Sequence, residues 1–242
     1  MQRYFIDSSF EEIAFTSEQI FHMQKVLRMK SGDEVEVVFK KQGYIITINS
    51  FNPFSYVIKE KIDYSSELNV ELTLLYCLPK GDKLEFVIQK ATEIGVKRII
   101  LVQSSRCVSK YKKEDFIRKL PRFNKIALEA SEQSHRFDVP VIEDLINFKQ
   151  IKDYKFDYSY IAYENEKNIR FDEELKKVNA GDKIAIIIGS EGGFSQDEVD
   201  YALRCGYTPI SLGKRILRSE TACVYSLSVI SYLLEDVKWK HS

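Results

Sequence analysis

Apolar and polar residues alternate with a period of two in three runs near the start of the chain. The runs are Glu34 to Phe39, Tyr44 to Ser50 and Ser55 to Ile62. Such alternation is typical of β-strands that bury one face. Lys40-Lys41-Gln42-Gly43 separates the first two runs, and its glycine favours a hairpin turn. We therefore expect residues 1–68 to form a small β-barrel.

A helical pattern precedes these strands. Ser17 is a suitable N-cap for a helix that runs to about Met29. Apolar residues recur there at intervals of three and four, which places them on one side of the helix. They are Ile20, Met23 and Leu27. The expected small domain thus combines a barrel with one amphipathic helix.

From residue 69 onward, continuous apolar runs alternate with helical patterns. The apolar runs are Val70 to Leu78, Lys97 to Val102, Tyr158 to Tyr163 and Lys183 to Ile188. Helical patterns follow Asp82 and cover Lys113 to Ser134 and Thr221 to Val237. Strand, helix and strand at this spacing form a βαβ unit, so we expect residues 69–242 to be an α/β domain with a mostly parallel sheet. Pro121 should begin a second helix within the long pattern.

The charge balance changes this picture little. Lysine plus arginine equals aspartate plus glutamate at 36 each, so the formal net charge is zero. This argues against a protein coated with nucleic acid. It leaves room for a local RNA site, because affinity follows basic patches that contact phosphates and not the total charge.

Neither a metal site nor a membrane segment is indicated. The four cysteines are scattered without a Cys-x-x-Cys pair and there are three histidines, so we expect buried thiols and no metal. No apolar run reaches the roughly 20 residues that cross a bilayer. The first ten residues lack the apolar block of a secretory signal. A cytoplasmic protein is expected.

The segment from Gly189 to Ser195 is the most informative part of the sequence, because it joins a buried strand to a helix. Its three glycines would let a ligand approach the backbone closely at the carboxyl end of a strand, where open α/β sheets bind ligands. The Gly-x-Gly-x-x-Gly and P-loop patterns are both missing, so a phosphate site is not favoured. A ligand loop and a merely tight connection fit this spacing equally well.

A second unusual segment, from Ile210 to Ala222, again reads as strand, glycine loop and helix, with Ser219 as the N-cap. Its loop holds Gly213 and the cations Lys214, Arg215 and Arg218. An apolar slot beside positive charge would suit a ligand. Solvated cations at a helix entrance are the alternative interpretation.

Together the two loops resemble the SPOUT class of methyltransferases, and further segments extend the resemblance to the RsmE family along nearly the whole chain. These segments are His22-Met23-Gln24-Lys25-Val26-Leu27-Arg28, Lys80-Gly81-Asp82, Gln89-Lys90-Ala91-Thr92-Glu93-Ile94-Gly95-Val96 and Glu129-Ala130-Ser131-Glu132-Gln133-Ser134-His135-Arg136. Departures from the family pattern are Ser190 in place of a common proline, Ser219 in place of threonine, and Cys107. They leave any side-chain role of Ser190 or Ser219 open.

The resemblance implies a fold and an activity that the residue patterns alone do not give. The fold is an N-terminal PUA-like β-barrel followed by an α/β domain tied in a trefoil knot. The activity is transfer of a methyl group from S-adenosylmethionine to N3 of one uridine in the decoding region of 16S ribosomal RNA. The family acts as a homodimer, and the small ribosomal subunit is the expected setting.

The resemblance also assigns cofactor binding to the two loops. The residues are Gly189, Ser190, Glu191, Gly192, Leu212, Gly213, Ile216, Leu217, Arg218, Thr221 and Ala222. Because S-adenosylmethionine already carries an activated methyl group, the protein must supply binding, orientation and electrostatics.

Two residues are candidates for catalysis. Negative charge develops on the uracil carbonyl oxygens when the N3 proton leaves, and a cationic donor would stabilise it. Arg136 stands at the family's position for such an arginine, with a phosphate contact or a surface role as the alternative. Glu191 could accept hydrogen bonds from cofactor or base, or could only cap nearby amides.

Basic residues in two regions are candidates for RNA binding. His22, Lys25 and Arg28 recur every three residues and would share one helix face. A second cluster includes Arg106, Lys110 and Arg122, and Arg136 is a further candidate. Either set could contact phosphates or could simply form a solvated charged surface.

Overall fold

The computed structural model describes residues 1–81, 83–108 and 111–235 and divides them into two compact units. Asp82, Lys110 and Val237, named in the sequence analysis, lie outside the described residues. The first unit comprises residues 1–67 and 131–138, and the second comprises 68–130 and the chain from 139 onward. Residues 131–138 therefore belong with the first unit, whereas we expected them in the second domain.

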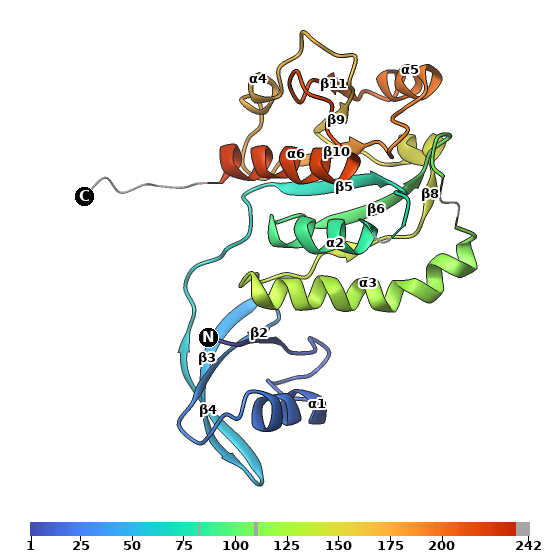
Figure 1. Ribbon diagram of the computed structural model, residues 1–242. Helices are drawn as coiled ribbons and strands as arrows, with labels where there is room; N and C mark the ends of the chain where they lie inside the picture. Colours follow the sequence, from blue (N-terminus) through green and yellow to red (C-terminus); the bar gives the residue numbers. More distant parts are fainter. Residues whose placement is uncertain (82, 109–110, 236–242) are drawn as a thin grey trace. The chain divides into compact units, whose positions relative to one another are not determined.

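The first unit is built on a four-stranded sheet in the order β1-β2-β3-β4 (Figure 1). Its strands are β1 (Arg3–Phe5), β2 (Glu34–Phe39), β3 (Gln42–Phe51) and β4 (Phe54–Lys61). β1 pairs with β2 in parallel, and the other two pairings are antiparallel. Alternate residues such as Val35, Val37, Ile46 and Ile48 are fully buried, as the period of two predicts.

The expected helix in this unit is shorter and less regular than predicted. The α-helix α1 (Ser17–Phe21) is capped by Thr16 and not by Ser17, and it continues as a π-helical turn, η1 (His22–Val26). The N–H of Leu27 bonds to the carbonyl of His22, five residues back, which shifts Leu27 out of register. Leu27 is consequently 40% exposed and not part of the core.

Buried charged groups hold the segment 131–138 within the first unit. The Arg3 guanidinium is almost fully buried, and its Nε donates to Glu36 Oε2 at 2.8 Å. Its Nη1 donates to the carbonyl oxygens of His135 and Arg136 at 2.6 and 2.7 Å. His135 Nδ1 lies 2.8 Å from the same Glu36 oxygen. Glu36 thus joins strand β2 to the turn after α3 (Lys113–Gln133).

Arg136 is part of this buried network and not an exposed cation. Its side chain is 2% exposed, and its Nη2 lies 2.5 Å from Glu67 Oε2 while Nε donates to Oε1 at 3.2 Å. Sequence alone did not indicate this pairing, because it cannot tell a buried arginine from an exposed one. The pairing with Glu67 does not favour direct contact of Arg136 with a uracil or a phosphate, and its catalytic and RNA-binding assignments stay predictions.

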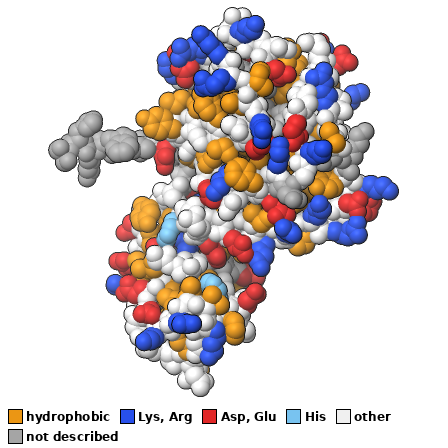
Figure 2. Space-filling model, in the orientation of Figure 1, with side chains coloured by type: hydrophobic (Ala, Val, Ile, Leu, Met, Phe, Trp, Pro, Cys, Tyr) orange, Lys and Arg blue, Asp and Glu red, His pale blue; other side chains and the backbone are white. Residues whose placement is uncertain are grey.

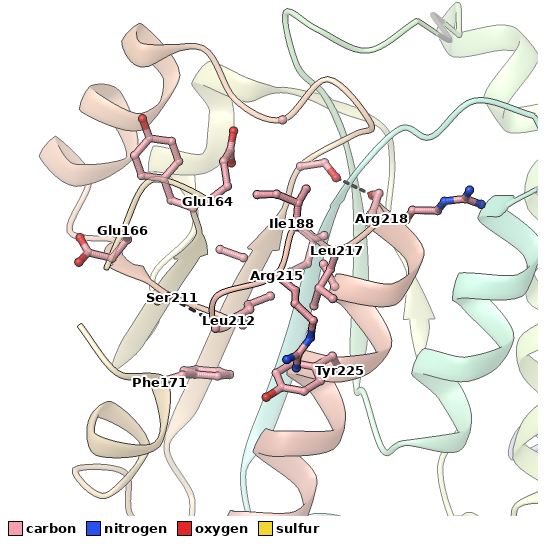
Figure 3. Close-up of a pocket in the computed structure, with 18 of the residues that line it drawn as sticks. Glu164, Glu166, Phe171, Ile188, Ser211, Leu212, Arg215, Leu217, Arg218 and Tyr225 are labelled. Carbon is pink, nitrogen blue, oxygen red and sulfur yellow. Dashed lines mark hydrogen bonds between the residues drawn. The ribbon is translucent and has the colours of Figure 1, made fainter. Parts of the chain in front are cut away.

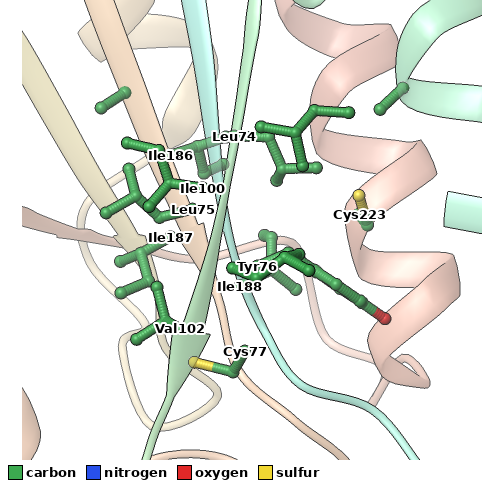
Figure 4. Close-up of a cluster of buried hydrophobic side chains, with 14 of the residues drawn as sticks. Leu74, Leu75, Tyr76, Cys77, Ile100, Val102, Ile186, Ile187, Ile188 and Cys223 are labelled. Carbon is green, nitrogen blue, oxygen red and sulfur yellow. The ribbon is translucent and has the colours of Figure 1, made fainter. Parts of the chain in front are cut away.

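The second unit is the predicted α/β domain. Its sheet has the strand order β11-β9-β10-β5-β6-β7, β8 also pairs with β6, and all of these pairings are parallel. The strands are β5 (Glu71–Cys77), β6 (Arg98–Gln103), β7 (Val141–Ile142), β8 (Ile146–Asn147), β9 (Tyr158–Ala162), β10 (Lys183–Ile188) and β11 (Thr208–Ile210). Central strands β5, β6 and β10 form the buried apolar core shown in Figure 4.

Helices cover this sheet (Figure 1). Besides α3 they are α2 (Lys83–Glu93), the 3-10 helix η2 (Phe148–Asp153), α4 (Phe171–Leu175), α5 (Gln196–Arg204) and α6 (Ser219–Leu234). α3 continues through Pro121, contrary to the predicted break. Phe116 and Phe123 on either side of the proline are both buried, and their packing outweighs the roughly 3 kcal/mol that an interior proline costs. Across the described ranges, no helix is long and apolar enough to cross a membrane.

Replacing Arg136 with alanine should lower the free energy of unfolding by about 3 to 5 kcal/mol, because Glu67 would keep a largely buried charge without its partner. Urea denaturation followed by circular dichroism measures this change. Arg122→Ala is the control, since it removes only an exposed ion pair with Glu85 and should cost at most about 1 kcal/mol. Wild-type stability of Arg136→Ala would show that the guanidinium is free for another role.

Stability should also fall at acidic pH through Glu36. Burial raises the pKa of the Glu36 carboxyl, but hydrogen bonds from Arg3 and His135 lower it by more, so the net shift is below the ordinary value of 4.5. The ionised group therefore stabilises the fold above pH 4.5, and this contribution is lost as the pH falls through the lower folded pKa. Urea midpoints measured from pH 6 to about pH 3 should fall less steeply in Glu36→Gln. Parallel curves for the two proteins would contradict this assignment.

Candidate functional site

The candidate site is a cavity of about 1130 Å³ in the second unit, at the carboxyl ends of β9 and β10 (Figure 3). These strands are parallel neighbours, so the loops that follow them leave the same edge of the sheet. The wall comes from the segments after β9, after β10 and after β11, and from the first half of α6. The glycine loop is thus part of a cavity wall and more than a tight connection.

Ten of the eleven residues predicted to bind the cofactor line this cavity. They are Gly189, Ser190, Glu191, Gly192, Leu212, Gly213, Ile216, Leu217, Arg218 and Ala222. Thr221 is exposed and lies outside the wall. Residues two apart on a helix point in different directions, so Thr221 faces away while Ala222 shares a side with Ser219. The position of Thr221 therefore does not support its predicted role in cofactor binding, and helical geometry alone would have indicated this.

Hydrogen bonds fix the glycine loop from within and from the loop after β6. The N–H of Gly193 donates to the Ser190 carbonyl at 2.9 Å, and Arg106 Nη1 donates to the Gly192 carbonyl at 3.0 Å. A Cβ atom on Gly192 would lie 2.9 Å from the Cβ of Arg106. Glycine at this position therefore makes room for Arg106, whereas the sequence suggested that it makes room for a ligand.

Ser219 begins α6 but is not its N-cap. Arg218 occupies the N-cap position without a side-chain cap hydrogen bond. The Ser219 Oγ instead lies 2.5 Å from the carbonyl oxygen of Gly189 and 3.0 Å from the hydroxyl of Tyr76. The residue that enters α6 is therefore bonded to the residue at which the chain leaves β10.

Glu191 is held by the start of α2. Its carboxylate lies 3.2 Å from the N–H of Lys80 and 2.9 Å from Lys83 Nζ, which is itself 3.1 Å from Glu220. Burial raises the pKa of Glu191, but the hydrogen bond from Lys83 and backbone N–H groups lower it overall, so the carboxylate is ionised at neutral pH. These contacts are those of the amide-capping interpretation and not of a free catalytic carboxylate.

Sequence reasoning missed the part of the wall that follows β9. Tyr163, Glu164 and Glu166 line the cavity, as does Phe171 at the start of α4. Tyr225 on α6 is a further lining residue. The strand ending near residue 163 was predicted, but its position next to β10 was not, because the spacing of apolar residues does not indicate the order of strands in a sheet. With that order known, the residues after both strands would have been candidates.

The predicted RNA-binding residues are divided between the two units. His22, Lys25 and Arg28 belong to the first unit, where the π-helical turn and the positive φ of Arg28 break the shared helix face that we predicted. Lys25 and Arg28 are exposed, whereas His22 Nδ1 lies 2.7 Å from the Tyr4 hydroxyl.

In the second unit Arg106 and Arg122 are exposed, Arg122 is paired with Glu85, and Lys110 lies outside the described residues. Figure 2 shows Lys and Arg side chains interspersed with Asp and Glu on the visible face, in keeping with the zero net charge. Exposure therefore leaves Lys25, Arg28, Arg106 and Arg122 as candidates for contact with phosphates.

Comparison with known sequences identifies both units. Residues 66–231 match the RNA methyltransferase domain family, and residues 15–49 match the RNA methyltransferase PUA domain. The first unit is therefore a PUA-like domain. The second has the SPOUT-type α/β fold that we predicted.

Individual relatives agree with these matches. The ribosomal RNA small subunit methyltransferase E of Bacillus subtilis is 34% identical, with 97% of this chain and 98% of that protein covered. The enzyme of the same name from Neisseria gonorrhoeae, solved with bound S-adenosylmethionine, has the same fold with a TM-score of 0.83 at 24% identity, over 96% and 98% of the two chains. A Legionella pneumophila structure with the cofactor bound has a TM-score of 0.81 at 26% identity, over 95% and 96%. The chain therefore belongs to the ribosomal RNA small subunit methyltransferase E family.

Proposed function

We propose that this protein transfers the methyl group of S-adenosylmethionine to N3 of a specific uridine in 16S ribosomal RNA. The observation that carries the proposal is the cavity built by the glycine loop and the loop after β11, in a chain of this family. Solved relatives with bound S-adenosylmethionine support the choice of cofactor. A ribosomal RNA substrate supports a cytoplasmic location.

The cavity residues fit this cofactor. Leu212 and Leu217 would supply apolar surface to the cofactor, and Glu164 would supply a carboxylate that can accept hydrogen bonds from its hydroxyl groups. Gly213 has a φ of +106° and a Cβ there would meet open space, so its backbone is accessible. Bound S-adenosylmethionine would supply the methyl group on a sulfonium, and the chain would supply binding and orientation.

The target base needs a cation near the oxygens on which charge develops. Arg136 is buried against Glu67, whereas two other cations line the cavity wall itself. Lys214 and Arg215 line the cavity, are exposed, and take part in no ion pair among the described residues. Figure 3 shows Arg215 directed toward Tyr225. These two side chains can stabilise the anion formed when the uracil N3 proton leaves.

A ligand panel and a methyl-transfer assay test the function. S-adenosylmethionine and S-adenosylhomocysteine should raise the melting temperature, whereas ATP and NAD should not. At a ligand concentration one hundred times Kd, binding should add about 2.7 kcal/mol to the free energy of unfolding. Labelled methyl groups should then enter 16S ribosomal RNA, tested both free and within small subunits. Because an N3-methyl group blocks base pairing, reverse transcription should stop at one uridine. Stabilisation by ATP or NAD alone would overturn the proposal.

We propose further that the protein is a homodimer that pairs through α6. Cys223, Leu227 and Ile230 on this helix are fully buried within the domain core. Tyr225 and Tyr232 are seven residues apart and so share the exposed side of the helix, where Tyr232 is 74% exposed, and Leu233 next to it is also exposed. An exposed row of large apolar side chains on an otherwise buried helix is typical of a protein interface.

Placing a charge on this face should separate the dimer. In Tyr232→Glu, two carboxylates without partners would be desolvated at the interface, so the mass measured by light scattering after gel filtration should fall from twice the chain mass to once. Leu203→Glu is the control, because Leu203 is similarly apolar and exposed but lies on α5. A wild-type monomer, or a dimer that survives Tyr232→Glu but not Leu203→Glu, would contradict this interface.

A further inference from the structure

Three groups from three elements form a chain of hydrogen bonds that begins in the cavity wall. Tyr76 is on β5, Ser219 opens α6, and Gly189 follows the last residue of β10. The Ser219 Oγ is 3.0 Å from the Tyr76 hydroxyl and 2.5 Å from the Gly189 carbonyl oxygen. A serine hydroxyl has one proton and a carbonyl can only accept, so Ser219 donates to Gly189 and accepts from Tyr76.

This chain lies in a dry part of the protein. Tyr76 is fully buried and Ser219 is 5% exposed, and Figure 4 shows the Tyr76 ring reaching from its strand toward the helix that carries Cys223. Burial raises the pKa of Tyr76, which keeps its hydroxyl proton available as a donor at every physiological pH. Hydrogen bonds in such low-dielectric surroundings are stronger, and leaving one of their groups unpaired is more costly.

The hydrogen bond from Ser219 to Gly189 joins the two ends of the segment that contains both loops. Gly189 and Ser219 bracket the 29 residues 190–218, which contain both predicted cofactor loops, and both bracketing residues line the cavity themselves. Ile188, next to Gly189, is in register with Tyr76 across the β10–β5 pair. The hydroxyl of Ser219 therefore closes the loop segment on itself and anchors the closure to the rigid centre of the sheet.

Helix capping does not explain the hydroxyl. Ser219 lies inside α6, where serine has no propensity advantage, and the N-cap is Arg218. Ser219 stands where the family commonly has threonine, and this replacement keeps the hydroxyl group. We propose that Ser219, supported by Tyr76, is a positioning residue that holds the two cofactor loops at the spacing that binds S-adenosylmethionine. This inference rests on the proposed cofactor.

Calorimetric titration of S-adenosylmethionine into single and double variants tests the proposal. Ser219→Ala should weaken binding about tenfold, the equivalent of one lost hydrogen bond of about 1.4 kcal/mol. Ser219→Thr keeps the hydroxyl and should bind within about twofold of wild type, and Tyr76→Phe, which leaves the Ser219 donation in place, should weaken binding only about threefold. In a serial chain, Tyr76→Phe should add nothing in the Ser219→Ala background.

Ser226→Ala is the matched control. Ser226 is also a buried serine on α6, and its Oγ donates to the Cys223 carbonyl at 3.0 Å without contacting the loops. Its removal should lower the melting temperature without changing the Kd. Wild-type affinity in Ser219→Ala, or additive effects in the double variant, would overturn the positioning role. If Ser219→Ala does not fold, wild-type affinity in Tyr76→Phe would overturn the part assigned to Tyr76. Failure of the wild-type protein to bind would instead reject the cofactor.

Discussion

Parallel pairing of β10 with β5 on one side and β9 on the other is the constraint on which the site depends. Six consecutive residues of β10 are in register with Glu71 to Tyr76, and four with Tyr158 to Ile161. This register ends the strands at one edge, so that the segments after β9 and β10 share a cavity. It also places Tyr76 beside the last residue of β10, within reach of the start of α6. The cavity wall and the hydrogen bonds from Ser219 to Tyr76 and Gly189 therefore both follow from the register of these strands.

The PUA-like unit depends on a different kind of interaction. Its apolar strands are supplemented by arginine and glutamate side chains that are buried in pairs, Arg3 with Glu36 and Arg136 with Glu67. The second pair joins the first 67 residues to the segment 131–138 directly, and the first pair does so through the bonds of Arg3 and Glu36 to His135. Buried ion pairs contribute little net stability against apolar substitutes, but losing one partner is costly. Their value here is that they select one position for a segment distant in sequence.

Local pattern predicted the strands, the parallel α/β class and the two loops, because burial on one or both faces leaves a period in the sequence. It failed where a contact between distant residues decided the outcome. The sequence does not distinguish the buried Arg136 from an exposed arginine, because its partner Glu67 is distant along the chain. Likewise, the local pattern at Pro121 is that of a helix start, and only the packing of Phe116 and Phe123 shows that the helix continues. The role of Ser219 was open for the same reason, since its partners are 30 and 143 residues away.

The first unit is formed from two segments that are separated along the chain, and this affects how such proteins can change during evolution. A domain encoded by one uninterrupted stretch can be moved, duplicated or lost as a block. Here a fragment ending at residue 67 would carry Arg3, Glu36 and Glu67 but neither His135 nor Arg136. The return segment is encoded inside the methyltransferase domain. The PUA-like and methyltransferase parts are thus inherited together, and recombination at the apparent boundary would separate Glu67 from Arg136 and leave both buried charges without their partner.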